Sequence, residues 1–270
     1  MEIHGEENTR ILDCRYVLSD PAAGIASYRR GHIPGSIHLD LGENLSSPIR
    51  AGTGRHPLPA VDLFQEAVGK WGVADNSAVI AYDDGPGAMA VRCWWLLRWF
   101  GHQSVYVLDG GLDAWINEGG VLADGTEAYP MAEFTGRPQQ NHWTDADSLM
   151  RAVDDPGQLI IDARENKRFL GLEEPIDRIA GHIPSAINRP FKCNLSGGRF
   201  KSANILRQEF IDLIGNTSPN QVVHSCGSGV TACHNLLAME VAGLYGSRLY
   251  AGSWSEWITD PTRPVIRAAG

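Results

Sequence analysis

The chain carries, at residues 222–233, the stretch VVHSCGSGVTAC, which has the pattern of a strand, a glycine-rich loop and the start of a helix. Gly227 and Gly229 allow the loop to curl so that several backbone N–H groups face one point. The helix expected over residues 230–241 adds partial positive charge at the same point. Cys226 stands at the head of the loop, where we expect a thiolate, or a group carried on one, to be stabilised.

The other four cysteines are predicted to be small buried hydrophobes, as most free cysteines are: Cys14, Cys93, Cys193 and Cys233. None of them has glycines beside it and a helix start directed at its sulfur. Cys226 is therefore the candidate nucleophile.

Composition limits the classes of function. A chain of 270 residues with 43% hydrophobic and 20% charged residues has room for two globular domains. The net charge of −9 argues against nucleic-acid or anionic-membrane partners. The first ten residues are unlike a secretory signal, and the most apolar stretch, residues 91–100, is too short to cross a bilayer. Five cysteines without metal-ligand spacing indicate neither a disulfide framework nor a zinc site, so we expect a cytoplasmic protein.

The chain repeats itself at long period. Four landmarks occur twice in the same order: ILDCR at 11–15 and IIDAR at 160–164, RGHIPGSI at 30–37 and AGHIPSAI at 180–187, AVIAYD at 78–83 and QVVHSC at 221–226, and DGGLDAW at 109–115 and AGSWSEW at 251–257. This order indicates a tandem duplication. We expect domains at 1–123 and 143–270, joined by a linker rich in Gly and Pro at 124–142.

Each half alternates short apolar strands with amphipathic helices, for example at residues 60–71 and 202–214. The pattern predicts an α/β fold with a mainly parallel sheet flanked by helices in each half. Ligands of such sheets bind at the carboxyl ends of the strands, where Cys226 stands. Asp83 takes the equivalent place in the first half. A carboxylate cannot perform thiol chemistry, so we expect the first half to act as scaffold.

The Cys226 loop, the paired GHIP segments and a first half without that cysteine make the chain resemble the two-domain rhodanese family of sulfurtransferases, from about Ile11 to Trp257. The loop is similar to the form found in members that use 3-mercaptopyruvate. Members that prefer thiosulfate usually carry two basic residues where Gly227 and Ser228 stand here. The resemblance implies two tandem rhodanese-like domains, the second of which is catalytic.

The resemblance also implies the reaction. A small anionic donor, 3-mercaptopyruvate or alternatively thiosulfate, would pass one sulfur to Cys226 as a persulfide. A thiol acceptor, such as a thioredoxin-like protein, or cyanide would then remove that sulfur, and no cofactor is required. A persulfide relay without turnover remains a further alternative. The backbone around the sulfur would stabilise the persulfide, with contributions from Gly227, Gly229, Val230 and Thr231.

Further site residues follow from the same resemblance. Arg168 matches an arginine that would bind the donor's carboxylate. Arg178, which is displaced by about two residues from the family's second arginine, is the candidate for a second substrate-binding arginine. Ser228 and His56 match a serine and histidine that would move a proton. Relatives hold an acid where Gly42 stands here. Asp40 and Glu43 flank that position, and Glu43 is the candidate acid beside Ser228 and His56.

Two rival classes fail on particular residues. The loop formally satisfies a dinucleotide-binding fingerprint, but the acid expected about 20 residues on is missing from residues 247–252. A cysteine phosphatase needs an arginine six residues after the cysteine, where Ala232 stands. The repeated histidines His32 and His182 are expected to shape turns. The Asp162 and Arg164 side chains are expected to form an ion pair at a strand end.

Overall fold

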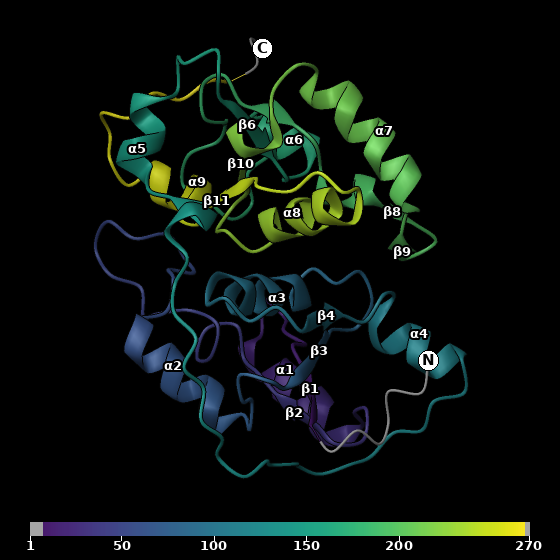
Figure 1. Ribbon diagram of the computed structural model, residues 1–270. Helices are drawn as coiled ribbons and strands as arrows, with labels where there is room; N and C mark the ends of the chain where they lie inside the picture. Colours follow the sequence, from purple (N-terminus) through teal and green to yellow (C-terminus); the bar gives the residue numbers. More distant parts are fainter. Residues whose placement is uncertain (1–7, 268–270) are drawn as a thin grey trace. The chain divides into compact units, whose positions relative to one another are not determined.

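The computed structural model describes residues 8–267 (Figure 1). Its contacts divide the chain into two compact units. The first holds the described residues up to Ser47 together with Pro59–Gln139, and the second holds Pro48–Leu58 together with the described residues from Gln140 onward. The domain boundaries predicted from the sequence stay predictions, and each unit is described by itself.

The first unit is built on a parallel sheet with strand order β2-β1-β3-β4. The strands are β1 (Thr9–Asp13), β2 (Ser36–His38), β3 (Ala78–Tyr82) and β4 (Val105–Val107). The helices are α1 (Pro21–Arg30), α2 (Val61–Lys70), α3 (Ala90–Trp99) and α4 (Gly111–Asn117). Helix α3 is apolar almost all round and is buried along nearly its whole length, as expected for a helix that lies within a core.

The second unit is built on a parallel sheet with strand order β5-β11-β10-β6-β7. Its strands are β5 (Trp143–Thr144), β6 (Leu159–Asp162), β7 (Ile187–Asn188), β10 (Val222–Ser225) and β11 (Arg248–Tyr250), and a separate antiparallel pair is formed by β8 (Leu195–Ser196) and β9 (Arg199–Phe200). Its helices are α5 (Ala146–Arg151), α6 (Asn166–Phe169), α7 (Ala203–Ile214), α8 (Ala232–Val241) and α9 (Ser253–Trp257), with 3₁₀ turns at Gln140–His142, Phe191–Asn194 and Pro219–Gln221.

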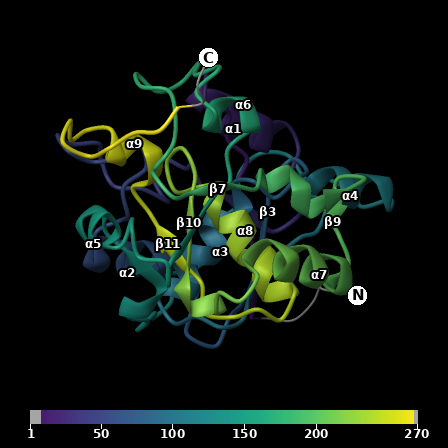
Figure 2. The same cartoon turned by 90° about the horizontal axis from the view of Figure 1, so that it is seen from above.

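Helices cover both faces of this second sheet (Figure 2). Because side chains alternate along a strand, Ile160 and Val223 point to one face and Ile161 and Val222 to the other. The first pair packs with α5 and α9, and the second pair packs with α7 and α8. Strands buried on both faces read as continuous apolar runs, which is the pattern that residues 159–161 and 222–223 show. The predicted fold class, α/β with mainly parallel sheets flanked by helices, is confirmed.

The duplication is visible in the strand registers. Asp13 lies opposite Tyr82 in the first sheet, and Asp162 lies opposite Ser225 in the second. The residues that follow, Asp83 and Cys226, are therefore structural equivalents.

The acid–arginine pairs at the ends of β1 and β6 are equivalent as well. The Arg164 guanidinium donates to the Asp162 carboxylate, at 2.7 Å for its closest contact, and to the backbone carbonyl of Gly181. Arg15 makes the same two contacts with Asp13 and with the carbonyl of Gly31. The buried ion pair expected at Asp162 and Arg164 is thus present, and it has a copy in the first unit.

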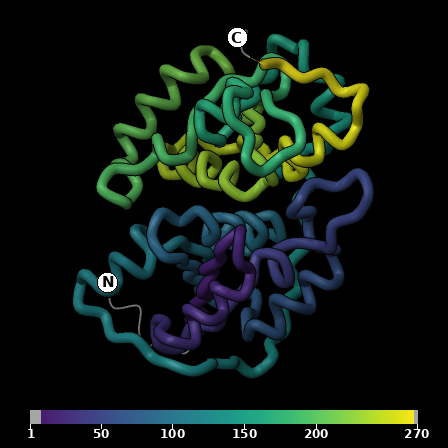
Figure 3. Tube along the Cα trace, turned by 180° about the vertical axis from the view of Figure 1, so that it is seen from behind, coloured from purple at the N-terminus to yellow at the C-terminus, as the bar shows by residue number. Residues whose placement is uncertain are grey.

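The two GHIP histidines make equivalent contacts: each lies against a backbone carbonyl oxygen and stacks on an aromatic ring. Nδ1 of His32 lies 2.8 Å from the Tyr28 carbonyl oxygen, and its ring stacks on Tyr28. Nδ1 of His182 lies 2.8 Å from the Phe169 carbonyl oxygen, and its ring stacks on Phe169. A bridge from His182 to Ile266 ties down the C-terminal stretch, drawn in yellow in Figure 3. Both histidines shape turns, as the sequence predicts.

The loop after β3 has the same glycine-rich turn, and an aspartate in place of the cysteine accepts hydrogen bonds from its backbone N–H groups. The Asp83 carboxylate accepts four backbone hydrogen bonds of 2.8–3.2 Å, from the N–H groups of Gly85, Gly87, Met89 and Ala90. These donors lie in the loop and at the start of α3, whose first N–H groups have no partner within the helix. The first unit therefore carries a built-in anion where the second unit carries a sulfur.

The burial of the minor cysteines is predicted correctly for Cys14, Cys93 and Cys233. The prediction is wrong for Cys193, which is exposed. It lies in the 3₁₀ turn Phe191–Asn194, where Asn194 is the residue that turns into the interior. Among the described residues, no helix is both long and apolar enough to cross a membrane.

Candidate active site

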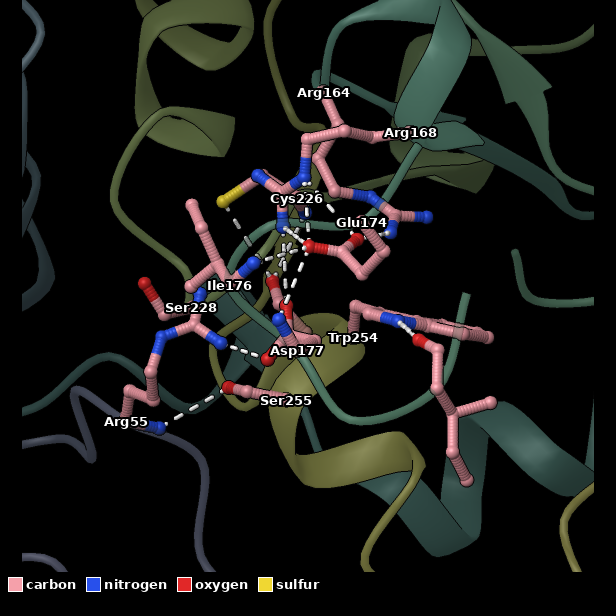
Figure 4. A network of polar contacts seen from close by, with 12 residues as sticks. Arg55, Arg164, Arg168, Glu174, Ile176, Asp177, Cys226, Ser228, Trp254 and Ser255 are labelled. Atoms are coloured by element: carbon pink, nitrogen blue, oxygen red, sulfur yellow. Dashed lines mark hydrogen bonds and ion pairs between the residues drawn. The ribbon is translucent and has the colours of Figure 1, made fainter. Parts of the chain in front are cut away.

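Cys226 lies directly after β10, at the carboxyl end of the second sheet (Figure 4). Its backbone N–H donates to Ser253 Oγ at 3.0 Å, and its carbonyl accepts the N–H of Trp254, so α9 fixes the residue from both sides. The Gly229 N–H donates to Cys226 Sγ at 3.2 Å. The residue is 2% exposed. The sulfur therefore lies against the loop and accepts the N–H of Gly229.

The two loop glycines are required for different reasons. Gly229 has φ +76°, and a Cβ there would lie 2.1 Å from the Ala251 carbonyl oxygen, so the backbone excludes any side chain. At Gly227 a Cβ would lie 2.9 Å from one terminal nitrogen of Arg55 and 3.6 Å from one of Arg168. Two guanidinium groups thus lie over Gly227, beside the cysteine.

Arg168 is held in place by acids. Its Nε and one terminal nitrogen donate to the Glu174 carboxylate at 2.8–3.1 Å, and the same terminal nitrogen donates to Asp177 Oδ2 at 3.1 Å. Glu174 is fixed in turn, because its Oε1 also accepts the backbone N–H groups of Ile176 and Asp177. The predicted carboxylate-binding arginine therefore lies beside Cys226 in a preorganised position.

Arg55 is a site residue that the sequence analysis did not single out. Its guanidinium pairs with Asp177 Oδ1, and its backbone N–H donates to Ser255 Oγ at 3.1 Å (Figure 4). Burial lowers the pKa of Arg55, the nearby Cys226 opposes that effect, and the like charge of Arg168 reinforces it. Its position next to His56 was the available signal. The decisive fact, that residues 48–58 belong to the second unit, is not encoded in any local pattern.

His56 and Ser228 are brought together, as predicted. His56 Nδ1 lies 2.8 Å from Ser228 Oγ, and both residues are buried. Which of the two atoms donates depends on the tautomer of the imidazole. The pair lies one residue from Gly227 and one from Arg55, so a group able to move a proton adjoins the two guanidinium groups.

Other predicted site residues have a mainly structural setting. Val230 is buried, and Thr231 begins α8 as its N-cap residue. Arg178 is exposed, and its guanidinium donates to the Ile258 carbonyl. Glu43 is an exposed residue of the first unit whose backbone N–H donates to Asp40. Roles for Arg178 in substrate binding and for Glu43 as the acid beside His56 stay predictions.

This arrangement combines a cysteine sulfur that accepts a backbone N–H, two guanidinium groups and a hydroxyl–imidazole contact. Comparison with known proteins agrees with it. The family model of the rhodanese-like domain matches the chain twice, at residues 2–118 and 145–260. The chain belongs to the rhodanese family.

Individual relatives narrow the comparison. The chain is 48% identical over 263 residues to a probable 3-mercaptopyruvate sulfurtransferase from Pseudomonas aeruginosa. The matched region covers 96% of this chain and 93% of the relative. It is 38% identical to the putative thiosulfate sulfurtransferase SseB of Mycobacterium tuberculosis, over 98% and 93% of the two chains. The crystal structure of SseA from Escherichia coli, a 3-mercaptopyruvate sulfurtransferase, superposes with a TM-score of 0.80 at 32% identity, over 93% and 94% of the chains.

Proposed function

We propose that this protein is a sulfurtransferase that moves a sulfur atom from 3-mercaptopyruvate to a thiol or cyanide acceptor through a persulfide on Cys226. The observation that carries the proposal is the position of the Cys226 sulfur, which receives the Gly229 N–H while Arg55 and Arg168 lie over Gly227. The Pseudomonas aeruginosa and Escherichia coli relatives, whose names state this activity, support the choice of donor.

In the first step the Cys226 thiolate attacks the donor's sulfur, and an S–S bond forms as the S–C bond of 3-mercaptopyruvate breaks. The electron pair of the broken bond leaves on the carbon as the enolate of pyruvate. The proton of the donor's thiol ends on that carbon, so the products are pyruvate and the Cys226 persulfide anion. Atoms and charge balance without an added oxidant or cofactor.

The Ser228–His56 pair is suited to carry that proton. The 2.8 Å contact joins a hydroxyl to an imidazole, a group that takes up and releases protons near neutral pH. The pair would remove the proton from the donor's thiol and return it to the developing enolate. This role requires both groups beside the donor, which is consistent with the place of Ser228 between Gly227 and Gly229.

The first unit offers a physical parallel for the persulfide. The outer sulfur of a persulfide lies about 2 Å beyond the cysteine sulfur and carries a negative charge, as the oxygens of an aspartate carboxylate do. In the equivalent loop of the first unit, the Asp83 carboxylate gathers four backbone N–H groups. We expect the Cys226 loop to hold the persulfide anion in a similar way.

In the second step an acceptor thiol attacks the outer sulfur, the S–S bond to Cys226 breaks, and the acceptor leaves as its own persulfide. Cyanide would leave as thiocyanate. The class of the acceptor, a thioredoxin-like protein or a small thiol, and a cytoplasmic location stay predictions from the sequence.

Thiosulfate transfer is the second candidate, because the Mycobacterium tuberculosis relative carries that name. The space at Gly227 argues for mercaptopyruvate. A long basic side chain there, as in relatives that prefer thiosulfate, would meet the Arg55 guanidinium.

Mass spectrometry after exposure to each donor tests the proposal. We expect one added sulfur on the peptide that contains Cys226, and a kcat/KM for 3-mercaptopyruvate well above that for thiosulfate. Cys226→Ser should lose both the added sulfur and the activity, whereas Cys193→Ser, which removes an exposed thiol elsewhere in the unit, should retain both. A higher kcat/KM for thiosulfate, or sulfur retained by Cys226→Ser, would contradict the proposal.

A further inference from the structure

The acid between the two active-site arginines is the feature that the reaction does not yet use. Asp177 pairs through Oδ1 with Arg55 and through Oδ2 with Arg168, so one carboxylate bridges two guanidinium groups next to Gly227. Its side chain is 5% exposed. A donor such as 3-mercaptopyruvate presents a carboxylate of the same size and charge to the same region. Resting on the proposed function, we infer that Asp177 occupies the place of the donor's carboxylate between Arg55 and Arg168, and that the donor binds by exchanging with it.

The charges of the cluster favour exchange over addition. Three guanidinium groups meet three carboxylates here: Arg55, Arg164 and Arg168 with Asp162, Glu174 and Asp177. The cluster is already neutral, so a further carboxylate beside the Cys226 thiolate would leave buried negative charge without a partner. When one carboxylate replaces another, both arginines keep an anionic partner.

Asp177 is better suited to leave than the other acids. The Glu174 carboxylate is fixed by two contacts from the Arg168 fork and by two backbone N–H groups. The Asp162 carboxylate is fixed by the Arg164 fork and by the Arg164 backbone N–H. The contacts of the Asp177 carboxylate are with the two guanidinium groups, and it lies in an irregular segment between α6 and β7. A rotation of this one side chain frees the terminal nitrogen of Arg55 and removes one of the two acids that share a terminal nitrogen of Arg168, while Glu174 keeps Arg168 in place.

Arg55 is able to accept the exchanged partner. Its Nε is buried and lacks a hydrogen-bond partner in the described structure, although the side chain as a whole is 25% exposed. An incoming carboxylate can use that donor as well as a terminal nitrogen, in the two-pronged geometry that arginine favours. Arg55 would thus act as the second donor-binding cation, the role that the sequence analysis considered for Arg178.

Binding of pyruvate to the full-length chain, measured by calorimetry, tests the inference. Pyruvate supplies the carboxylate without the reactive sulfur, and its amide, pyruvamide, serves as the uncharged control. We expect Asp177→Asn to bind pyruvate about tenfold more tightly than the unmodified chain, the equivalent of about 1.4 kcal/mol, and to bind pyruvamide unchanged. Arg55→Met should weaken pyruvate binding by a similar factor.

The matched control is Glu173→Gln. It removes a negative charge from the same segment, but Glu173 pairs with Lys167 on the exposed surface, so pyruvate binding should not change. Asp177→Ser provides a second neutral variant if the asparagine form does not fold. Pyruvate affinity that is unchanged or lower in the Asp177 variants, or an equal gain for pyruvamide, would overturn the inference.

This readout needs no turnover, so its failure differs from that of the proposed function. If the unmodified chain does not transfer sulfur from 3-mercaptopyruvate, the proposed function fails while pyruvate binding still reports on the exchange. If sulfur is transferred but pyruvate binding ignores the charge of residue 177, only the exchange is wrong.

Discussion

At the scale of single residues, the site depends on what the loop lacks. Gly229 combines a positive φ with a would-be Cβ placed against the Ala251 carbonyl oxygen, so its backbone N–H reaches the Cys226 sulfur only if residue 229 has no side chain. Gly227 has space for Arg55 and Arg168 for a similar reason. The two glycines thus allow a backbone N–H to reach the sulfur and two guanidinium groups to lie over Gly227.

We predict that Gly229→Ala destabilises the protein by more than the roughly 1–2 kcal/mol that a left-handed residue costs, because the new methyl group also overlaps a backbone oxygen 2.1 Å away. Urea unfolding measures the loss, and sulfur loading of Cys226 should fall with it. Gly197→Ala is the control, since Gly197 has φ +59° but no atom within 4 Å of its would-be Cβ. Equal losses in the two variants would show that contact with Ala251 does not matter.

The nucleophile and its loop were predictable from local signals, namely a strand, a cysteine, spaced glycines and a helix start. Arg55 and Asp177 were not, because their importance arises from one ion pair between segments 122 residues apart. No periodicity marks either residue. Asp83 was recognised as the counterpart of Cys226, but the four backbone donors that converge on it become visible only in the folded loop.

At the scale of elements, amphipathic pattern located the longer helices closely. The prediction of 60–71 became α2, Val61–Lys70, and the prediction of 202–214 became α7, Ala203–Ile214. The predicted helices start one residue early because Ala60 and Ser202 are N-cap residues. An N-cap residue precedes the helix and does not have helical backbone angles. Short elements such as α6, Asn166–Phe169, are held by tertiary contacts and leave no periodic signal.

Strand β10 carries a buried titratable group next to the site, His224. Burial, with a smaller contribution from Arg189, lowers its pKa to about 3 from the ordinary value of 6.5. Between pH 6.5 and 3 the unfolded chain therefore binds a proton that the folded chain does not. Stability should fall as the pH decreases through this range, by up to about 1.4 kcal/mol per pH unit for this group.

We predict that His224→Gln, which cannot take up this proton, reduces the slope of stability against pH between 6.5 and 3. Denaturant unfolding at a series of pH values measures the slope. At pH 8 residue 224 is neutral in both proteins, so the difference found there gives the cost of the substitution itself. Identical slopes in the two proteins would contradict the assignment of acid sensitivity to His224.

At the scale of the whole molecule, the two units share one fold but carry different residues in the equivalent loop. Both units have a buried acid–arginine pair at a strand end, that of β1 in the first and that of β6 in the second, and both use a GHIP histidine to shape a turn. They differ at the position that follows β3 and β10, where Asp83 stands in the first unit and Cys226 in the second. The duplication was predictable because four sequence landmarks recur in the same order. The matching strand registers of the two sheets agree with it.

We predict that Asp83→Ala destabilises the protein by about 2–4 kcal/mol, since it leaves four backbone donors in and after the loop without their carboxylate. Thermal unfolding measures this loss. Sulfur transfer per folded molecule should be unchanged, because Asp83 belongs to the first unit. Asp84→Ala, at a neighbouring position with a largely exposed side chain, should have little effect on stability. A loss of turnover in the folded Asp83 variant would show that the first unit contributes to the chemistry.

The fixed carboxylate of Asp83 means that the charges in the two equivalent loops differ in how long they persist. Its negative charge is part of the polypeptide, so the first loop keeps the same occupant from synthesis to degradation. Under the proposed function, the anion in the second loop is a persulfide that forms and is removed in every reaction cycle. The charge in the second loop then depends on the sulfur donor, whereas the charge in the first loop does not.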